Sequence, residues 1–258
     1  MHAHFVLAHP EPQSFNAHLV RAGSEALEAE GWAVSVSDLY AMGFDPCERP
    51  EHYRDRAAPA RFDAQVEQRH ASEAGSLPKT VMDELALMDR ADLMVLQYPM
   101  WLRLPPAMVK GWFDRVLAYG AVYTSTKRFE NGRFVGKRAM LSVTVGTSRA
   151  TYEHDGRSGD IDLLLWPVNF TLAYVGYRVL APYVAYGVEA GLRYSDPAAI
   201  EERLRAVVSD FRATLPRISE RETIPFNRME EWGPDGRITP GAPVHSPFVR
   251  RNKQLNLE

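Results

Sequence analysis

Three short stretches of this 258-residue chain carry side chains whose types and spacing could do chemistry. The first follows the apolar residues 5–8. His9 and Asn16 can donate hydrogen bonds from an imidazole and an amide. Ser14 stands where a helix N-cap is expected, and Phe15 begins a run with helical spacing. Free backbone N–H groups and the helix dipole converge at such a helix start, which favours an anion. The stretch therefore predicts a phosphate cradle, with an ordinary capped turn between strand and helix as the alternative.

The second stretch, residues 97–106, follows another apolar run and is rich in aromatic residues and proline. Tyr98 and Trp101 are large flat side chains, and three prolines stiffen the backbone around them. A rigid aromatic and apolar loop suits one face of a planar ring ligand. The alternative is that Trp101 only packs under the helix that follows.

The third stretch, residues 144–152, is rich in hydroxyl groups and contains Gly146. A glycine here lets backbone N–H groups come close to the carbonyl and nitrogen edge of a ring. We expect Tyr152 to place a phenol beside the same edge. A polar loop with a packed tyrosine is the alternative.

Several functional classes are disfavoured by what the chain lacks. It contains neither G-x-G-x-x-G nor a P-loop, which argues against a Rossmann dinucleotide enzyme or an NTPase, and it has no G-x-S-x-G nucleophile elbow. The eight histidines are dispersed and Cys47 is the only cysteine, so neither a metal site nor an intramolecular disulfide is expected. A net charge of −3 with scattered basic residues gives no footprint for nucleic acid.

The chain also carries no sign of a membrane or secretory address. No stretch approaches the roughly 20 apolar residues that span a bilayer, and no basic leader or cleavage site precedes the first strand. A single cysteine fits a reducing compartment. We therefore expect a cytoplasmic protein without a membrane span.

Apolar runs and helical periodicities alternate along the chain, and this alternation predicts the fold. Strands are expected near residues 5–8, 34–38, 93–96, 138–145 and 178–185, and helices near residues 14–30, 77–90, 105–117, 160–176 and 197–215. Five such strands favour an α/β fold, a flavodoxin-like doubly wound parallel sheet of order 2-1-3-4-5 with helices on both faces. In that order the carboxyl ends of strands one, three and four meet, so the three stretches are expected to form one site.

Two segments fall outside the alternation. Residues 47–76 are dominated by Arg, Glu, Asp, His and Ala, and we expect a long surface excursion with room for a short helix. Residues 216–258 are rich in Pro, Gly, Arg and Glu without periodicity. We therefore divide the chain into a domain, residues 1–215, and an irregular C-terminal extension, residues 216–258, that packs on the domain or on a partner subunit.

In these residues the chain resembles the NAD(P)H:quinone oxidoreductases of the DT-diaphorase type, a family of flavodoxin-like flavoenzymes. The resemblance covers roughly residues 3–185 in order. Its most specific part is the block Lys110-Gly-Trp-Phe-Asp-Arg115 together with Trp166-Pro167. Further matches lie in residues 7–9, 14–16, 31–32, 37–42, 97–99, 106–116, 141–146 and 159–160.

The resemblance implies non-covalent FAD, with FMN less expected, NAD(P)H as co-substrate, a quinone as acceptor, and a homodimer with its active site at the subunit interface. A reduced nicotinamide would deliver hydride to the flavin and leave, and the quinone would then take both electrons in ping-pong fashion. Tyr152 and His154 would be the catalytic residues, and Tyr123, Thr124 and Ser125 would line the substrate pocket. The cofactor would be bound by His9, Ser14, Phe15, Asn16, Met100, Trp101, Leu102, Arg103, Thr144, Val145, Gly146, Thr147 and Tyr152.

The chain departs from the family pattern at several positions. Ser158 takes the place of the histidine that the family pairs with the Tyr152 equivalent, so His154 would have to substitute for it. Ser125 replaces a second pocket tyrosine, and Asp63 replaces a glutamine near the adenine. This altered pocket leaves two alternatives open: a flavin-dependent reductase of azo or nitro compounds, and a non-catalytic flavin-binding module that carries electrons or senses redox state.

Overall fold

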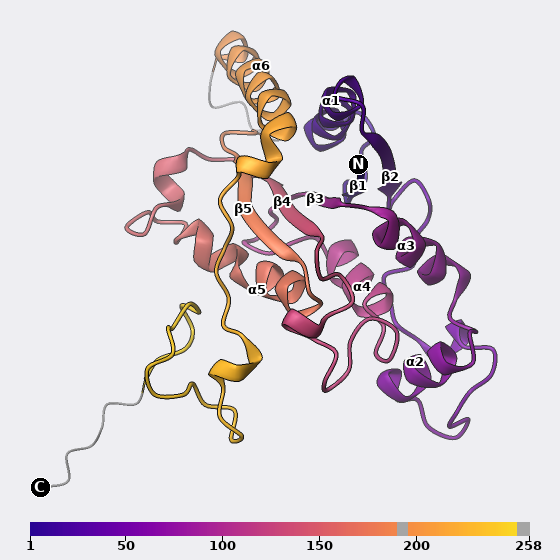
Figure 1. The fold of residues 1–258 in the computed structure, drawn as a ribbon. Helices are drawn as coiled ribbons and strands as arrows, with labels where there is room; N and C mark the ends of the chain where they lie inside the picture. Colours follow the sequence, from indigo (N-terminus) through magenta and orange to yellow (C-terminus); the bar gives the residue numbers. More distant parts are fainter. Residues whose placement is uncertain (190–195, 252–258) are drawn as a thin grey trace, which may run out of the picture.

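The sheet has the predicted strand order. The computed structural model describes residues 1–189 and 196–251 (Figure 1). Within these residues five parallel strands form one sheet in the order β2-β1-β3-β4-β5. The strands are β1 His2–Leu7, β2 Ala33–Asp38, β3 Leu93–Pro99, β4 Arg138–Thr144 and β5 Arg178–Ala185. The loops after β1, β3 and β4 therefore leave the same edge of the sheet side by side, as the sequence predicted.

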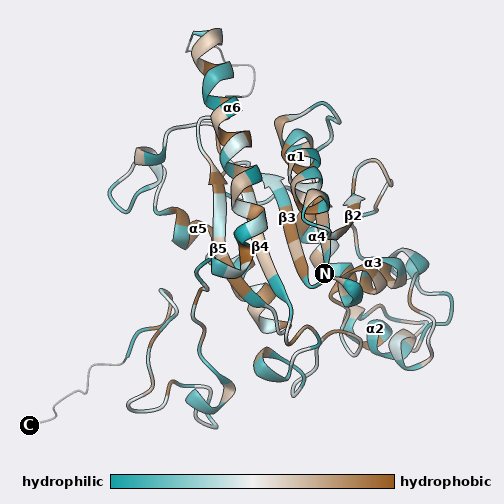
Figure 2. Ribbon diagram, turned by 45° about the horizontal axis from the view of Figure 1, so that its top comes forward, coloured by the Kyte–Doolittle hydropathy of each residue, from teal (hydrophilic) through white to brown (hydrophobic). Residues whose placement is uncertain are grey.

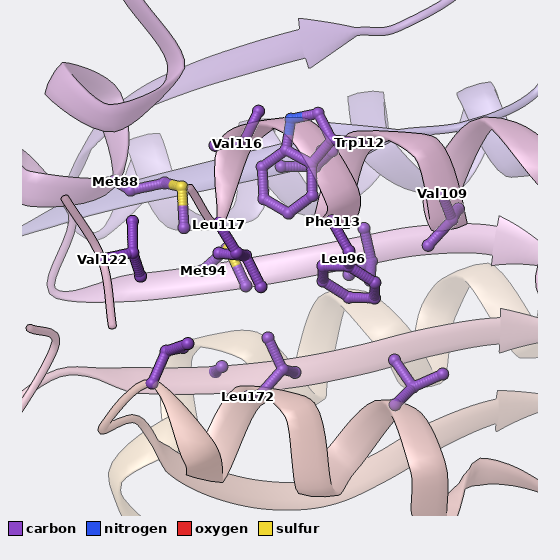
Figure 3. Packing of buried hydrophobic residues seen from close by; sticks show 14 of the residues in the cluster. Met88, Met94, Leu96, Val109, Trp112, Phe113, Val116, Leu117, Val122 and Leu172 are labelled. Atoms are coloured by element: carbon purple, nitrogen blue, oxygen red, sulfur yellow. The ribbon is translucent and has the colours of Figure 1, made fainter. Parts of the chain in front are cut away.

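Helices cover both faces of the sheet. One face carries α1 Phe15–Ala29, α6 Pro197–Thr214 and the 3-10 helix η4 Leu215–Glu220. The other carries α3 Lys79–Arg90, α4 Ala107–Val116 and α5 Ile161–Tyr174. Each face has its own apolar core. Phe5 and Phe211 belong to the first, and Figure 3 shows Trp112 and Leu172 among the side chains of the second. The fold is doubly wound, with helices on both faces of the sheet. Alternate residues of the buried strands point into the two cores.

Strand β3 is longer than residues 93–96, where the sequence indicated it. It continues through Gln97 and Tyr98 to Pro99. Tyr98 is completely buried in the core on the α4 side, and its burial raises the pKa of the phenol. The expectation that Tyr98 belongs to an aromatic loop beside a ring ligand was therefore wrong.

The excursion over residues 47–76 contains the 3-10 helix η1 Pro50–His52 and the helix α2 Ala64–Glu73. A buried polar side chain holds it together. Glu67 is 0% exposed and accepts hydrogen bonds from Arg56 Nε at 2.9 Å and from the backbone N–H of Ala57 at 2.8 Å. This polar anchor explains why the segment is ordered although its sequence has no apolar period.

The C-terminal segment lies along the outer edge of β5. Its residues 222–224 pair with the strand in the antiparallel sense, since Ala181 N donates to Glu222 O at 2.8 Å and Ile224 N donates to Val179 O at 2.9 Å. The apolar core extends to Ile218 in η4, slightly beyond the predicted boundary at residue 215. From there the segment runs past β5 and away from the sheet, and it is largely polar (Figures 1 and 2).

Three further 3-10 helices lie in connecting segments: η2 Phe129–Asn131, η3 Arg149–Tyr152 and η5 Met229–Glu231. Across residues 1–189 and 196–251, none of the helices combines the length and the apolar composition needed to cross a bilayer.

Candidate active site

A buried triad of polar side chains joins the ends of β3 and β4 to the start of α1. Gln97 Nε2 donates to Asn16 Oδ1 at 2.8 Å, and Asn16 Nδ2 donates to Thr144 Oγ1 at 3.1 Å. All three residues are almost fully buried. A satisfied amide between partners from three elements fixes their relative positions. The side chains of Asn16 and Thr144 are thus engaged in shaping the site, and Gln97, which the sequence reasoning did not single out, completes the triad.

The start of α1 lies where the sequence predicts a phosphate cradle. Ser14 caps the helix, because its Oγ accepts from Ala17 N at 3.2 Å, and its own backbone N–H donates to Glu11 O at 3.1 Å. These bonds use two of the four N–H groups that a helix start leaves free. The backbone N–H groups of Phe15 and Asn16 have no partner among the described residues. They remain available to an anion at the positive end of the helix.

His9 stands beside this cradle as a neutral donor. Its Nδ1 accepts the backbone N–H of Glu11 at 3.0 Å, so the neutral ring carries its proton on Nε2. Partial burial lowers the pKa of His9, which favours this neutral form at physiological pH. The ring also meets Trp101 edge to face, with 6.1 Å between ring centroids. This contact links the loops after β1 and β3.

The loop after β3 is a tight hairpin whose tip lies in solvent. Trp101 and Leu104 exchange backbone hydrogen bonds at 2.9 and 3.0 Å, while Met100 N donates to Thr144 O at 2.9 Å. Between them Leu102 and Arg103 have φ values of 50° and 69°, a left-handed conformation that costs about 1–2 kcal/mol for each residue with a side chain. Leu102 is 96% exposed and Trp101 is 44% exposed, so Trp101 does not pack under α4.

The loop after β4 separates residues that position it from residues that can contact a ligand. Val145 is buried, and both of its main-chain groups are bonded, to Ala185 O and to Val188 N. Gly146 and Thr147 are exposed, and their backbone N–H groups have no partner within the described ranges. The Thr147 hydroxyl lies 2.7 Å from the hydroxyl of Thr151. Gly146 and Thr147 are therefore the donors that this loop offers.

Tyr152 ends the helix η3 and packs against a residue that the sequence reasoning missed. Its ring centroid lies 6.2 Å from that of Tyr186, which follows β5. His154 is exposed, and nothing in the described residues joins it to Tyr152. Ser158 reaches back through its backbone N–H, which donates to Thr151 O at 2.8 Å. The loop thus turns so that Ser158, rather than His154, is tied to the segment that holds Tyr152.

Tyr123, Thr124 and Ser125 lie at the opposite end of the strands from the three loops. They follow α4, which returns from the carboxyl edge, and they precede β4, which starts at the amino edge. Tyr123 packs edge to face on Tyr174 at the end of α5, with 5.5 Å between centroids, and its hydroxyl accepts from Gln65 Nε2 at 3.4 Å. One chain therefore does not bring the predicted substrate residues to its own cradle. The sequence did not indicate that Tyr174 belongs to this aromatic cluster, because Tyr174 lies near the end of a predicted helix without any distinguishing pattern.

The remaining predicted position, Asp63, caps the helix α2. Its carboxylate accepts from the backbone N–H groups of Gln65 and Val66 at 3.1 and 3.2 Å. A carboxylate engaged in capping explains why this residue can replace the family's glutamine without disturbing the local fold.

A sheet of this order, with backbone donors gathered where β1, β3 and β4 end, defines a flavodoxin-like protein, and the family model of the flavodoxin-like fold matches residues 1–210. NAD(P)H dehydrogenase (quinone) 1 of Cavia porcellus is 38% identical over 185 residues, which cover 71% of this chain and 67% of that protein. Ribosyldihydronicotinamide dehydrogenase (quinone) of Homo sapiens is 35% identical over 230 residues, 88% and 96% of the two chains. A solved structure described as a quinone reductase of Klebsiella pneumoniae superposes with a TM-score of 0.82 at 30% identity and covers 93% of this chain and 94% of its own. The chain belongs to the flavodoxin-like family and, within it, to the NAD(P)H:quinone oxidoreductases.

Proposed function

We propose that this protein is an FAD-dependent reductase that transfers two electrons from NAD(P)H to a quinone. The observation that carries the proposal is the order of free donors along one edge of the sheet. The N–H groups of Phe15 and Asn16 lie at one side, the exposed Trp101 lies on the loop between, and the N–H groups of Gly146 and Thr147 lie at the other side. A flavin nucleotide likewise has its phosphate at one end and its ring at the other, so the loop with Trp101 would lie beside the ring. When bound, the flavin supplies the redox chemistry, because it accepts hydride from a nicotinamide and passes it to a quinone.

Each group at this edge has a role in the proposal. His9 Nε2 and the start of α1 bind the phosphates, since a neutral imidazole and two free amides are donors without a competing acceptor. Met100 and the hairpin at Trp101, Leu102 and Arg103 bound one face of the ring. Gly146 and Thr147 donate to the ring edge, where negative charge develops on reduction. The phenol of Tyr152 stabilises that charge and holds a proton beside it.

His154 is the proposed partner of Tyr152 in proton handling. Because its side chain is exposed, the loop over residues 153–158 must close for the two to meet. The variant His154→Ala is then expected to change the pH dependence of flavin reduction. A profile identical to that of the wild type assigns the role to Ser158 or to solvent.

We also propose that two copies of the chain form each active site. Tyr123 and Tyr174 form an aromatic surface that lies far from the cradle of their own subunit. The edge of the sheet that carries the cradle has backbone donors but no such aromatic surface. Leu102 and Leu104, 96% and 65% exposed, leave apolar surface beside that edge for a second copy to cover. Dilution until the protein is monomeric should abolish activity, and a fully active monomer would refute the shared site.

Two experiments test the function itself. Extraction of the flavin from the purified protein, followed by mass measurement, distinguishes FAD from FMN. Anaerobic stopped-flow mixing with NADH or NADPH should bleach the flavin within seconds, and a benzoquinone should restore its colour. A protein that neither reductant bleaches is the alternative flavin-binding carrier or sensor, and one that prefers an azo dye or a nitroaromatic to the quinone is the alternative reductase.

We also propose a cytoplasmic location, which rests on Cys47 being the only cysteine.

A further inference from the structure

A large cavity lies at the other end of the sheet, where β4 and β5 begin. Its volume is about 790 Å³, within the range of about 300–1,000 Å³ that small-molecule sites occupy. The amino ends of the two strands form one wall, and the C-terminal segment that runs beside β5 in Figure 1 forms another. Four arginines contribute to the lining: Arg138, Arg178, Arg221 and Arg228.

Two of these arginines are placed side by side by the register of the sheet. Arg138 and Arg178 are the first residues of β4 and β5, and they are direct partners in the parallel pairing. Partner residues point to the same face of a sheet whose strands are about 4.8 Å apart, so like charges there repel each other. Neither guanidinium has a carboxylate partner among the described residues. The fold therefore concentrates positive charge at this corner without neutralising it.

The C-terminal segment adds to this charge. Arg221 is half buried and donates to main-chain carbonyls of residues 181–182 in β5, which fixes its guanidinium against the strand. The one carboxylate of the lining belongs to Glu130, and it accepts the backbone N–H of Met229 at 3.0 Å. That bond joins η2 to the C-terminal segment beside the cavity. The acidic group is thus used to close the wall rather than to pair with an arginine.

We propose that this cavity is a second binding site, which takes a small organic anion with two acidic groups on an aromatic body. Guanidinium groups bind phosphate, carboxylate and sulfonate oxygens with paired, charge-assisted hydrogen bonds. Phe129 and Phe226, which also line the cavity, supply the surface for an aromatic body. The site lies at the amino end of the strands, opposite the candidate active site, and its occupation does not depend on the flavin.

The test is isothermal titration of the flavin-saturated protein with 1,5-naphthalenedisulfonate at low salt. The wild type should bind one probe per chain. The variant Arg138→Gln/Arg178→Gln should bind at least about tenfold more weakly, because it loses two charge-assisted contacts. The control Arg54→Gln/Arg217→Gln removes the same charge from exposed arginines outside the cavity and should stay within about twofold of the wild type.

A second variant keeps the test decisive if the first folds poorly. Thr223→Glu places a carboxylate in the wall beside the arginines, and it should also weaken the probe at least about tenfold. The proposal is overturned if the wild type gives no binding heat with up to roughly 10 mM probe, because its affinity would then be weaker than millimolar. It is overturned equally if both cavity variants bind like the wild type, which would place the probe elsewhere. The proposal also fails if the wild-type protein is an oligomer that does not bind the probe and the variant Arg138→Gln/Arg178→Gln dissociates into smaller species. In that case the cavity is a contact between subunits.

Discussion

Removal of the Asn16 side chain tests whether the buried triad holds the candidate site together. In Asn16→Ala, Gln97 Nε2 loses its acceptor at 2.8 Å and Thr144 Oγ1 loses its donor at 3.1 Å. Each buried polar group left without a partner costs about 1–3 kcal/mol, so we expect a loss of about 2–6 kcal/mol in the free energy of unfolding. With a urea slope of about 2.5 kcal/mol/M, the midpoint should fall by about 1–2.5 M.

The matched control is Asn169→Ala in α5. Asn169 is also buried, at 2% exposed, but its Oδ1 has no partner in the described chain, so no other group loses a hydrogen bond. Urea unfolding of the flavin-free proteins, followed by circular dichroism, should show Asn16→Ala less stable than this control by at least about 1 kcal/mol. Equal losses, or a change of less than about 0.5 kcal/mol in Asn16→Ala, would refute the reasoning. The flavin dissociation constant should rise as well, because the cradle starts at the same residue.

Three further predictions concern single side chains. Burial lowers the pKa of His4 from 6.5 to about 4, so on acidification the unfolded chain takes up the proton before the folded chain does. The free energy of unfolding should therefore be highest above pH 6.5 and fall by about 2–3 kcal/mol as the pH drops to about 4.5. Urea unfolding at the two pH values should show this loss in the wild type and in the exposed control His18→Gln but not in His4→Gln. Ser14→Ala removes the acceptor of Ala17 N and should cost about 1 kcal/mol in thermal unfolding, whereas Ser14→Asp should keep the cap. Tyr152→Phe should slow flavin reduction by NAD(P)H about tenfold or more while the flavin stays bound, and an unchanged rate would remove Tyr152 from the mechanism.

The order of the strands was predictable because the apolar runs and the helical periods alternate so regularly. The same regularity located the start of α1, where the cradle is predicted, since Ser14 stands at a helix start after a buried strand. The length of β3 was not predictable from its residues. Tyr98 and Pro99 have the composition of a loop, and only their neighbours in space make them a buried strand end.

Pairings between distant residues were the other limit. Gln97 joins Asn16 across 81 positions of the chain, and Tyr123 meets Gln65 across 58. No local pattern encodes such contacts, because they depend on how whole elements pack. Asn16 and Val145, which were both expected to bind the cofactor, also make structural hydrogen bonds that the sequence did not indicate. Asn16 makes them with its side-chain amide, and Val145 makes them with its main-chain N–H and carbonyl.

The pairing of residues 222–224 with β5 also governs how copies of this chain can associate. A sheet that grows from molecule to molecule needs two open edges in every copy. Here one edge is occupied by the chain's own C-terminal segment, and in the described residues β2 is the remaining open edge. Pairing through β2 can join two copies, whereas residues 222–224 cover β5 at residues 179–181 and hinder pairing through that strand. A chain cut before residue 221 would expose the second edge, and it should aggregate where the full chain does not.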